Sequence, residues 1–117
     1  QGIPWPGAQD KLLYRPMLPG ELQELTRKQQ VTSTIVVEAS PLLEDNQWLL
    51  DLAHKEPFMA GVVGRLDPAQ GEFPRQLRRF AADPLFRGIR INQQELRQGL
   101  DQKDVLRHLQ LLAEFDR

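Results

Sequence analysis

Three apolar segments, beginning at residues 34, 59 and 86, constrain the fold most strongly. They cover residues 34–39, 59–66 and 86–91, and their β-branched, aliphatic and glycine content is typical of short buried strands. Helical patterns follow the second and third segments, where apolar side chains recur at i, i+4, i+7 and i+8: Phe73, Leu77, Phe80 and Ala81, then Val105, Leu109, Leu112 and Ala113. Alternating strands and helices predict an α/β fold with a parallel sheet.

The two faces of these strands distinguish a doubly wound sheet from a (β/α)8 barrel. One face of each strand is purely apolar or glycine, and we expect it to pack against the helices: Ile35, Val37 and Ala39, then Val62, Gly64 and Leu66, then Ile89 and Ile91. The opposite face becomes charged near the C-terminal end of each strand, through Glu38, Arg65, Asp67 and Arg90. Helices cover both faces of a doubly wound sheet, where such charges would be costly to bury. The pattern therefore predicts a partial TIM barrel.

The rest of the chain divides into an irregular segment and one incomplete domain. Residues 1–18 are proline-containing and aperiodic, with Trp5, Leu12, Leu13 and Tyr14 as expected anchors. Residues 19–117 hold the partial barrel, from a first helix that begins at Pro19 to a fourth helix at the end. Neither terminus has the pattern of a chain end, so we expect a portion of a longer protein. Three strands cannot close a barrel, and we expect remaining barrel segments or self-association to cover the strand edges.

Composition excludes several classes of function. The net charge is −1 and the basic residues are scattered, which argues against a nucleic-acid partner. The densest basic group, Arg75, Arg78 and Arg79, is expected to form the solvated face of a helix. No apolar run approaches the roughly 20 residues of a membrane span. The chain has no cysteine, which rules out disulfides and thiolate zinc sites and leaves both cytoplasm and periplasm open.

Three runs in this order resemble one known family: VVEASPLLEDNQWLLDLA at 36–53, FMAGVVGRLDP at 58–68 and DPLFRGIR at 83–90. The sequence resembles the amidohydrolase-related metal-dependent hydrolases, TIM-barrel members of the amidohydrolase superfamily that include lactonases. The resemblance implies that the three segments are strands two, three and four of the barrel. It also implies that the full-length enzyme hydrolyses a small-molecule lactone or amide through water activated by a divalent metal, zinc or manganese.

In that family the metal ligands lie on barrel segments that this chain does not contain. The resemblance therefore implies no catalytic residue and no metal ligand in this chain, no metal bound by the chain alone, and no activity of the chain alone. His54 and His108 both lie within helical patterns, away from the strand ends, and we expect surface or helix-capping roles for them. Ser40 is expected to be the N-cap of a helix that begins at Pro41.

The charges at the strand ends are the candidate substrate-binding residues: Arg90, Arg65, Glu38 and Asp67, called the strand-end residues below. One interpretation is a structural ring of ion pairs, with Glu38 beside Arg65 and Arg65 beside Arg90. The other is that Arg90, and after it Arg65, holds a substrate oxygen through the planar fork of its guanidinium. A different class of function also stays open, namely a non-enzymatic α/β binding domain stabilised by oligomerisation.

Overall fold

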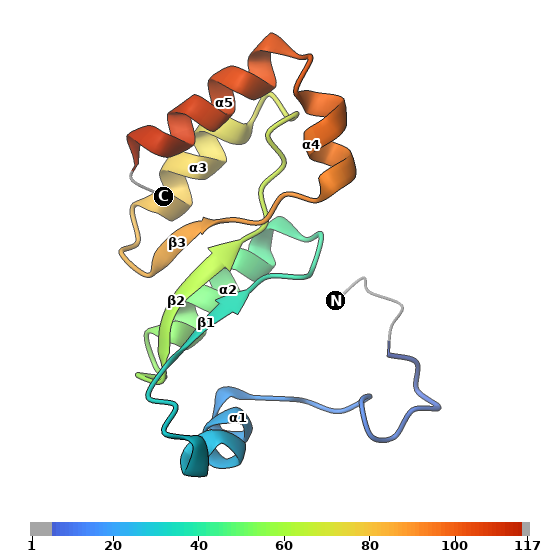
Figure 1. Cartoon of the computed structure of the whole chain (residues 1–117), viewed down its shortest axis with the longest axis vertical. Helices are drawn as coiled ribbons and strands as arrows, with labels where there is room; N and C mark the ends of the chain where they lie inside the picture. Colours follow the sequence, from blue (N-terminus) through green and yellow to red (C-terminus); the bar gives the residue numbers. More distant parts are fainter. Residues whose placement is uncertain (1–5, 116–117) are drawn as a thin grey trace.

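A three-stranded parallel sheet with the order β1–β2–β3 forms the centre of the chain. The computed structural model in Figure 1 describes residues 6–115. The strands are β1 (Thr34–Val37), β2 (Met59–Gly64) and β3 (Phe86–Ile89), all within the predicted segments. The α/β class and the parallel pairing are thus confirmed, although each strand ends two residues before the predicted end, at 37, 64 and 89 instead of 39, 66 and 91.

Helices connect and follow the strands as the periodicity predicts. The chain forms α1 (Pro19–Thr26), a 3-10 turn η1 (Arg27–Gln29), α2 (Leu43–Ala53), α3 (Phe73–Ala81), α4 (Gln93–Gly99) and α5 (Lys103–Glu114). Only α4 was not expected, because it has no apolar stripe. None of the helices within residues 6–115 combines the length and the apolar character that a membrane crossing requires.

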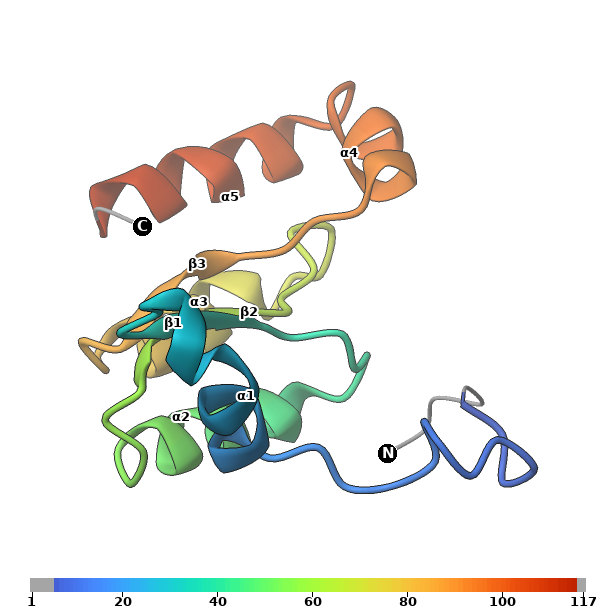
Figure 2. The ribbon, with the colours of Figure 1, turned by 60° about the horizontal axis from the view of Figure 1, so that its bottom comes forward.

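The helices cover one face of the sheet in succession. In Figure 2 these helices follow one another around the same side of the strands, with α2 below, α3 behind and α5 above. One core joins this face to the helices, and its fully buried members include Leu50, Val62, Leu77, Phe80 and Phe86. Consecutive strands in sequence order, with helices on a single face, make up the arrangement of part of a (β/α)8 barrel rather than of a doubly wound sheet.

The facing of β1 is opposite to the prediction. Ile35 and Val37 are 56% and 52% exposed, whereas Val36 packs on the core. The register explains this, because Val36 lies opposite Val62 and so shares the helix-facing side of β2. The prediction holds for β2, where Val62 and Leu66 are buried. Composition therefore predicts the wrong face of β1, because the purely apolar face is the exposed one and the face with Glu38 packs toward the helices.

The start of α2 also differs from the prediction. Its N-cap is Leu42, and the helix begins two residues after Pro41, at Leu43. The Ser40 hydroxyl accepts a hydrogen bond from the Leu42 backbone N–H at 3.1 Å, which forms a turn before the helix rather than a helix cap.

An ion pair on the outer surface joins α2 to α3. Arg79 donates two hydrogen bonds to the Glu44 carboxylate, at 2.8 and 2.7 Å. These hydrogen bonds hold the pKa of Glu44 below its ordinary value of 4.5 and raise that of Arg79. Arg75, Arg78 and Arg79 are all exposed, as the solvated-face interpretation predicts.

The segment before α1 runs away from the sheet (Figure 1). The expected anchors Leu12, Leu13 and Tyr14 are 75%, 45% and 59% exposed, so the anchoring prediction is wrong for these three, and Trp5 lies outside the described residues. The Asp10 carboxylate accepts hydrogen bonds from the Leu12 and Leu13 backbone at 3.1 and 3.0 Å, and this local turn points the side chains outward. The division at residue 18 stays a prediction.

Candidate functional site

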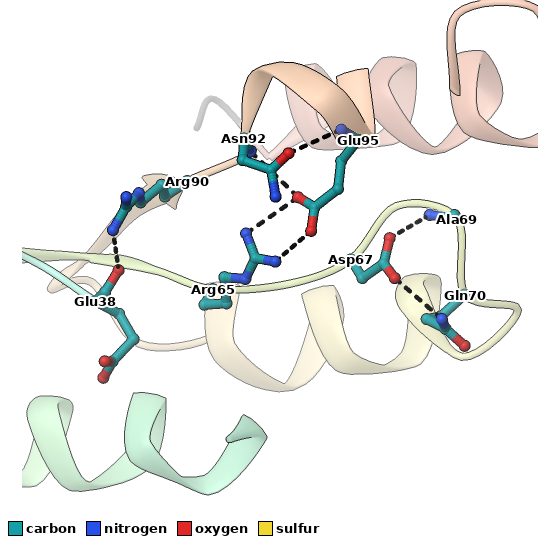
Figure 3. A network of polar contacts seen from close by, with 8 residues as sticks. All are labelled: Glu38, Arg65, Asp67, Ala69, Gln70, Arg90, Asn92 and Glu95. Carbon is teal, nitrogen blue, oxygen red and sulfur yellow. Dashed lines mark hydrogen bonds and ion pairs between the residues drawn. The ribbon is translucent and has the colours of Figure 1, made fainter. Parts of the chain in front are cut away.

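The C-terminal ends of the three strands lie at one edge of the sheet, where the active sites of (β/α)8 barrels are found. Backbone hydrogen bonds extend past the strands and hold their ends in line. The Glu38 N–H donates to the Val63 carbonyl at 2.8 Å, and the Arg90 N–H donates to the Gly64 carbonyl at 2.7 Å. Arg65 and Arg90 each follow the last residue of a strand, so their backbones are fixed beside each other (Figure 3).

Arg65 is paired with Glu95, from the first turn of α4. Its Nη1 donates to Glu95 Oε2 at 3.1 Å, and its Nη2 contacts Oε1, so the guanidinium fork is bidentate. Both side chains are about three-quarters buried, with 23% and 26% exposed. The same carboxylate accepts a hydrogen bond from the Asn92 N–H at 3.2 Å and completes a capping box for α4. Glu95 is therefore a site residue that the sequence prediction missed.

Arg90 is an exposed residue directly after the end of β3. Its Nη1 donates to the backbone carbonyl of Glu38 at 3.5 Å, a long and weak contact. Within residues 6–115, no carboxylate forms an ion pair with it. Of the two arginines, Arg90 is the one with free hydrogen-bonding capacity.

The Glu38 carboxylate does not join these arginines. The side chain is 7% exposed and points toward α2, away from Arg90 (Figure 3). Its Oε1 accepts hydrogen bonds from the backbone N–H groups of Ala39 at 2.7 Å and Ser40 at 2.5 Å. The predicted ring, with Glu38 beside Arg65, is replaced by the Arg65–Glu95 pair, because the register of β1 turns Glu38 to the helix side.

Asp67 shapes the loop after β2. Its carboxylate accepts hydrogen bonds from the Ala69 N–H at 2.9 Å and from the Gln70 side chain at 3.0 Å. An open hollow of about 280 Å³ lies next to it, lined by Pro41, Leu43, Arg65, Leu66, Asp67, Gln70 and Gln76. The hollow lies between the loop after β1, the start of α2, the loop after β2 and α3.

Both histidines serve contacts between elements. His54 lies at the C-terminal end of α2, and its Nε2 is 2.8 Å from the Asp83 carboxylate. His108 Nδ1 donates to the Pro68 carbonyl at 2.7 Å, and its ring stacks on Phe73 with 5.2 Å between centroids. Residues 6–115 contain no group of three or more His, Cys, Asp or Glu side chains that could hold a metal ion. These residues do not fit the divalent metal that the resemblance implies.

Comparison with known proteins agrees with this architecture. The sequence pattern of the amidohydrolase family matches residues 2–117. The chain is 38% identical over 92 residues to the L-fucono-1,5-lactonase of Burkholderia ambifaria, a match that covers 79% of this chain and 32% of that lactonase. The chain thus spans about a third of the length of the curated relative it matches. No solved structure matches it. The match across almost all of its residues shows that this chain belongs to the amidohydrolase family.

Proposed function

We propose that the chain is part of a hydrolase that opens a lactone of a small polyhydroxy acid, with Arg90 on the substrate side. The observation that carries this proposal is the 38% identity to a lactonase over 79% of the chain. The open position of Arg90 at the C-terminal ends of the strands supports it, because barrel enzymes bind their substrates there.

Arg90 has the chemistry that lactone opening requires. When water adds to the ester carbonyl, negative charge develops on oxygen, and ring opening leaves a carboxylate. A guanidinium stabilises both through charge-assisted hydrogen bonds from its fixed fork. Arg65 already directs two N–H groups at Glu95, so we assign it the secondary role of supporting the site. Glu38 and Asp67 shape the loops beside it.

The metal and the activity of the isolated chain form a separate part of the proposal. A divalent metal, zinc or manganese, supplies an activated water in the enzymes that the sequence resembles. Residues 6–115 offer no cluster of ligands for it. We therefore propose that the metal is held outside these residues in the full-length protein and that the 117-residue chain alone hydrolyses no lactone.

The test is Arg90→Met in the full-length protein, assayed with aldono-1,5-lactones and with matched amides. Loss of charge-assisted hydrogen bonds to the reacting ester lowers kcat/KM by roughly 10- to 100-fold, while the melting temperature stays near that of the parent. Arg78→Met is the matched control, since Arg78 is exposed on α3. Unchanged kinetics in Arg90→Met would rule out the substrate role.

A second function, a non-enzymatic binding domain stabilised by oligomerisation, is favoured by one observation. Ile35 and Val37 expose an apolar face of β1, and β1 is an edge of the sheet. A full-length protein that hydrolyses no lactone or amide, together with a stable metal-free oligomer of the chain, would support this alternative.

A further inference from the structure

Asn46 is a fully buried polar side chain that holds the backbone of another element. It lies in α2 and is 0% exposed. Its Oδ1 accepts a hydrogen bond from the Arg65 N–H at 2.7 Å. Its Nδ2 donates to the Arg65 carbonyl at 3.0 Å and to the Leu43 carbonyl at 2.9 Å. The amide therefore binds both backbone groups of Arg65 at once.

These contacts replace a missing strand partner. β2 ends at Gly64, so the N–H and C=O of Arg65 would be left without ladder hydrogen bonds in a partly buried place. An asparagine side chain has one acceptor and one donor group and so reproduces the pairing that a neighbouring strand would give. A carboxylate in its place would accept from the Arg65 N–H but would face two carbonyl oxygens.

The backbone of Arg65 links contacts on the two sides of the sheet. Asn46 hydrogen-bonds to the Arg65 backbone from the helix side, while the Arg65 guanidinium points to the other side and pairs with Glu95. Glu95 in turn caps α4 through Asn92, two residues after Arg90. A continuous set of contacts thus runs from Asn46 in α2, through Arg65 and Glu95, to the segment that carries Arg90. Figure 3 shows the part of this set from Arg65 onward.

We propose that Asn46 is a positioning residue: it fixes the backbone of Arg65 and, through the Arg65–Glu95 pair, the place of Arg90 in the site. The part of this inference that concerns activity rests on the proposed lactone hydrolysis. The part that concerns the position of Arg65 stands on the hydrogen bonds alone.

Two measurements on the full-length protein test the inference. Amide hydrogen exchange reports the position directly, and Asn46→Ala is expected to remove protection at the Arg65 N–H while leaving Val62 protected. Kinetics report the consequence, and Asn46→Ala is expected to lower kcat/KM by roughly 10- to 100-fold, since a displacement of about 1 Å can cost that much. Asn46→Ser serves the same purpose if Asn46→Ala fails to fold.

Leu50→Ala is the matched control, because Leu50 is 1% exposed on the same helix and belongs to the core rather than to the Arg65 contacts. It should destabilise the protein without the exchange change at Arg65. A double variant adds a second check. If Asn46 acts through Arg65, Asn46→Ala should change kcat/KM much less in an Arg65→Met background than in the parent.

The outcomes separate the two proposals. A parent that opens no lactone overturns the proposed function, and the exchange at Arg65 still decides the role of Asn46. An Arg65 N–H that stays protected in Asn46→Ala overturns the inference. So does a loss of kcat/KM that is equal in Leu50→Ala, or one that is fully additive with Arg65→Met.

Discussion

At the scale of single residues, Gly64 lets α2 approach the end of β2. A Cβ at this position would lie 2.6 Å from Asn46 Oδ1 and 2.5 Å from Phe86 Cε2. Both neighbours are fully buried and cannot move into solvent. The absence of a side chain at residue 64 is therefore the condition for the Asn46 contacts and for the close packing of Phe86 on the same face.

The first prediction follows from this close approach. Gly64→Ala should destabilise the full-length protein by about 1–3 kcal/mol, the range typical of one added methyl in a well-packed core. Urea denaturation monitored by circular dichroism measures it. Gly20→Ala is the matched control, since a Cβ there would meet no side chain of another residue outside its own chain neighbours within 4 Å, and alanine favours a helix. Equal stability of Gly64→Ala and the parent would contradict the close approach of Asn46 and Phe86 to residue 64.

At the scale of elements, His108 joins α5 to the part of the chain that follows β2. Its Nδ1–H donates to the Pro68 carbonyl, and its ring stacks on Phe73 at the start of α3. Val105, one turn earlier, is 1% exposed. Leu111 and Leu112 are only partly buried against the core, so the contacts of His108 and Val105 contribute much of the attachment of this helix.

The second prediction concerns this attachment. His108→Ala should lower the free energy of unfolding by about 1–3 kcal/mol, from one hydrogen bond and one aromatic stack. The loss should be local, because α2 shares none of these contacts. Hydrogen exchange should therefore rise in α5 before it rises in α2. Gln110→Ala, an exposed change in the same helix, should leave both unchanged. A uniform rise across α2 and α5 would contradict the local attachment.

The elements that could be predicted from the sequence are those whose pattern has one interpretation. The apolar stripe of Phe73, Leu77 and Phe80 predicts α3, and the structure buries all three side chains. The facing of β1 could not be predicted, because Ile35 and Val36 are both apolar and only the pairing with β2 decides which one is buried. The strand-end arginines were identified from charge at the ends of apolar segments.

Contacts between residues that are far apart in the sequence could not be predicted. Arg65 and Glu95 are 30 residues apart, and nothing local indicates that they meet. Asn92 and Glu95 do show the spacing of a capping box, which is a signal for the start of α4. Asn46 reads as an ordinary helix residue, because the need for its amide arises only where β2 ends beside α2.

At the scale of the whole molecule, the chain is less compact than a closed domain of its length. Its radius of gyration is 16.0 Å, whereas about 13 Å is typical for this size. The segment before α1 extends away from the sheet, and the side of the sheet opposite the helices exposes Ile35 and Val37. Both outer strands, β1 and β3, have one edge without a partner among the described residues. Such edges pair readily with other strands.

The last prediction follows from this open side. The 117-residue chain by itself should self-associate, since apolar side chains and free strand edges lie together on one surface. Val37→Lys should shift it toward the monomer, because an inserted charge on the exposed face of an edge strand opposes stacking and pairing. Size-exclusion chromatography with light scattering over a range of concentrations measures the effect. Leu106→Lys is the control, as Leu106 is 43% exposed on α5, away from the open face. A chain that is monomeric at every concentration, or an equal response to both substitutions, would show that the open face does not drive association.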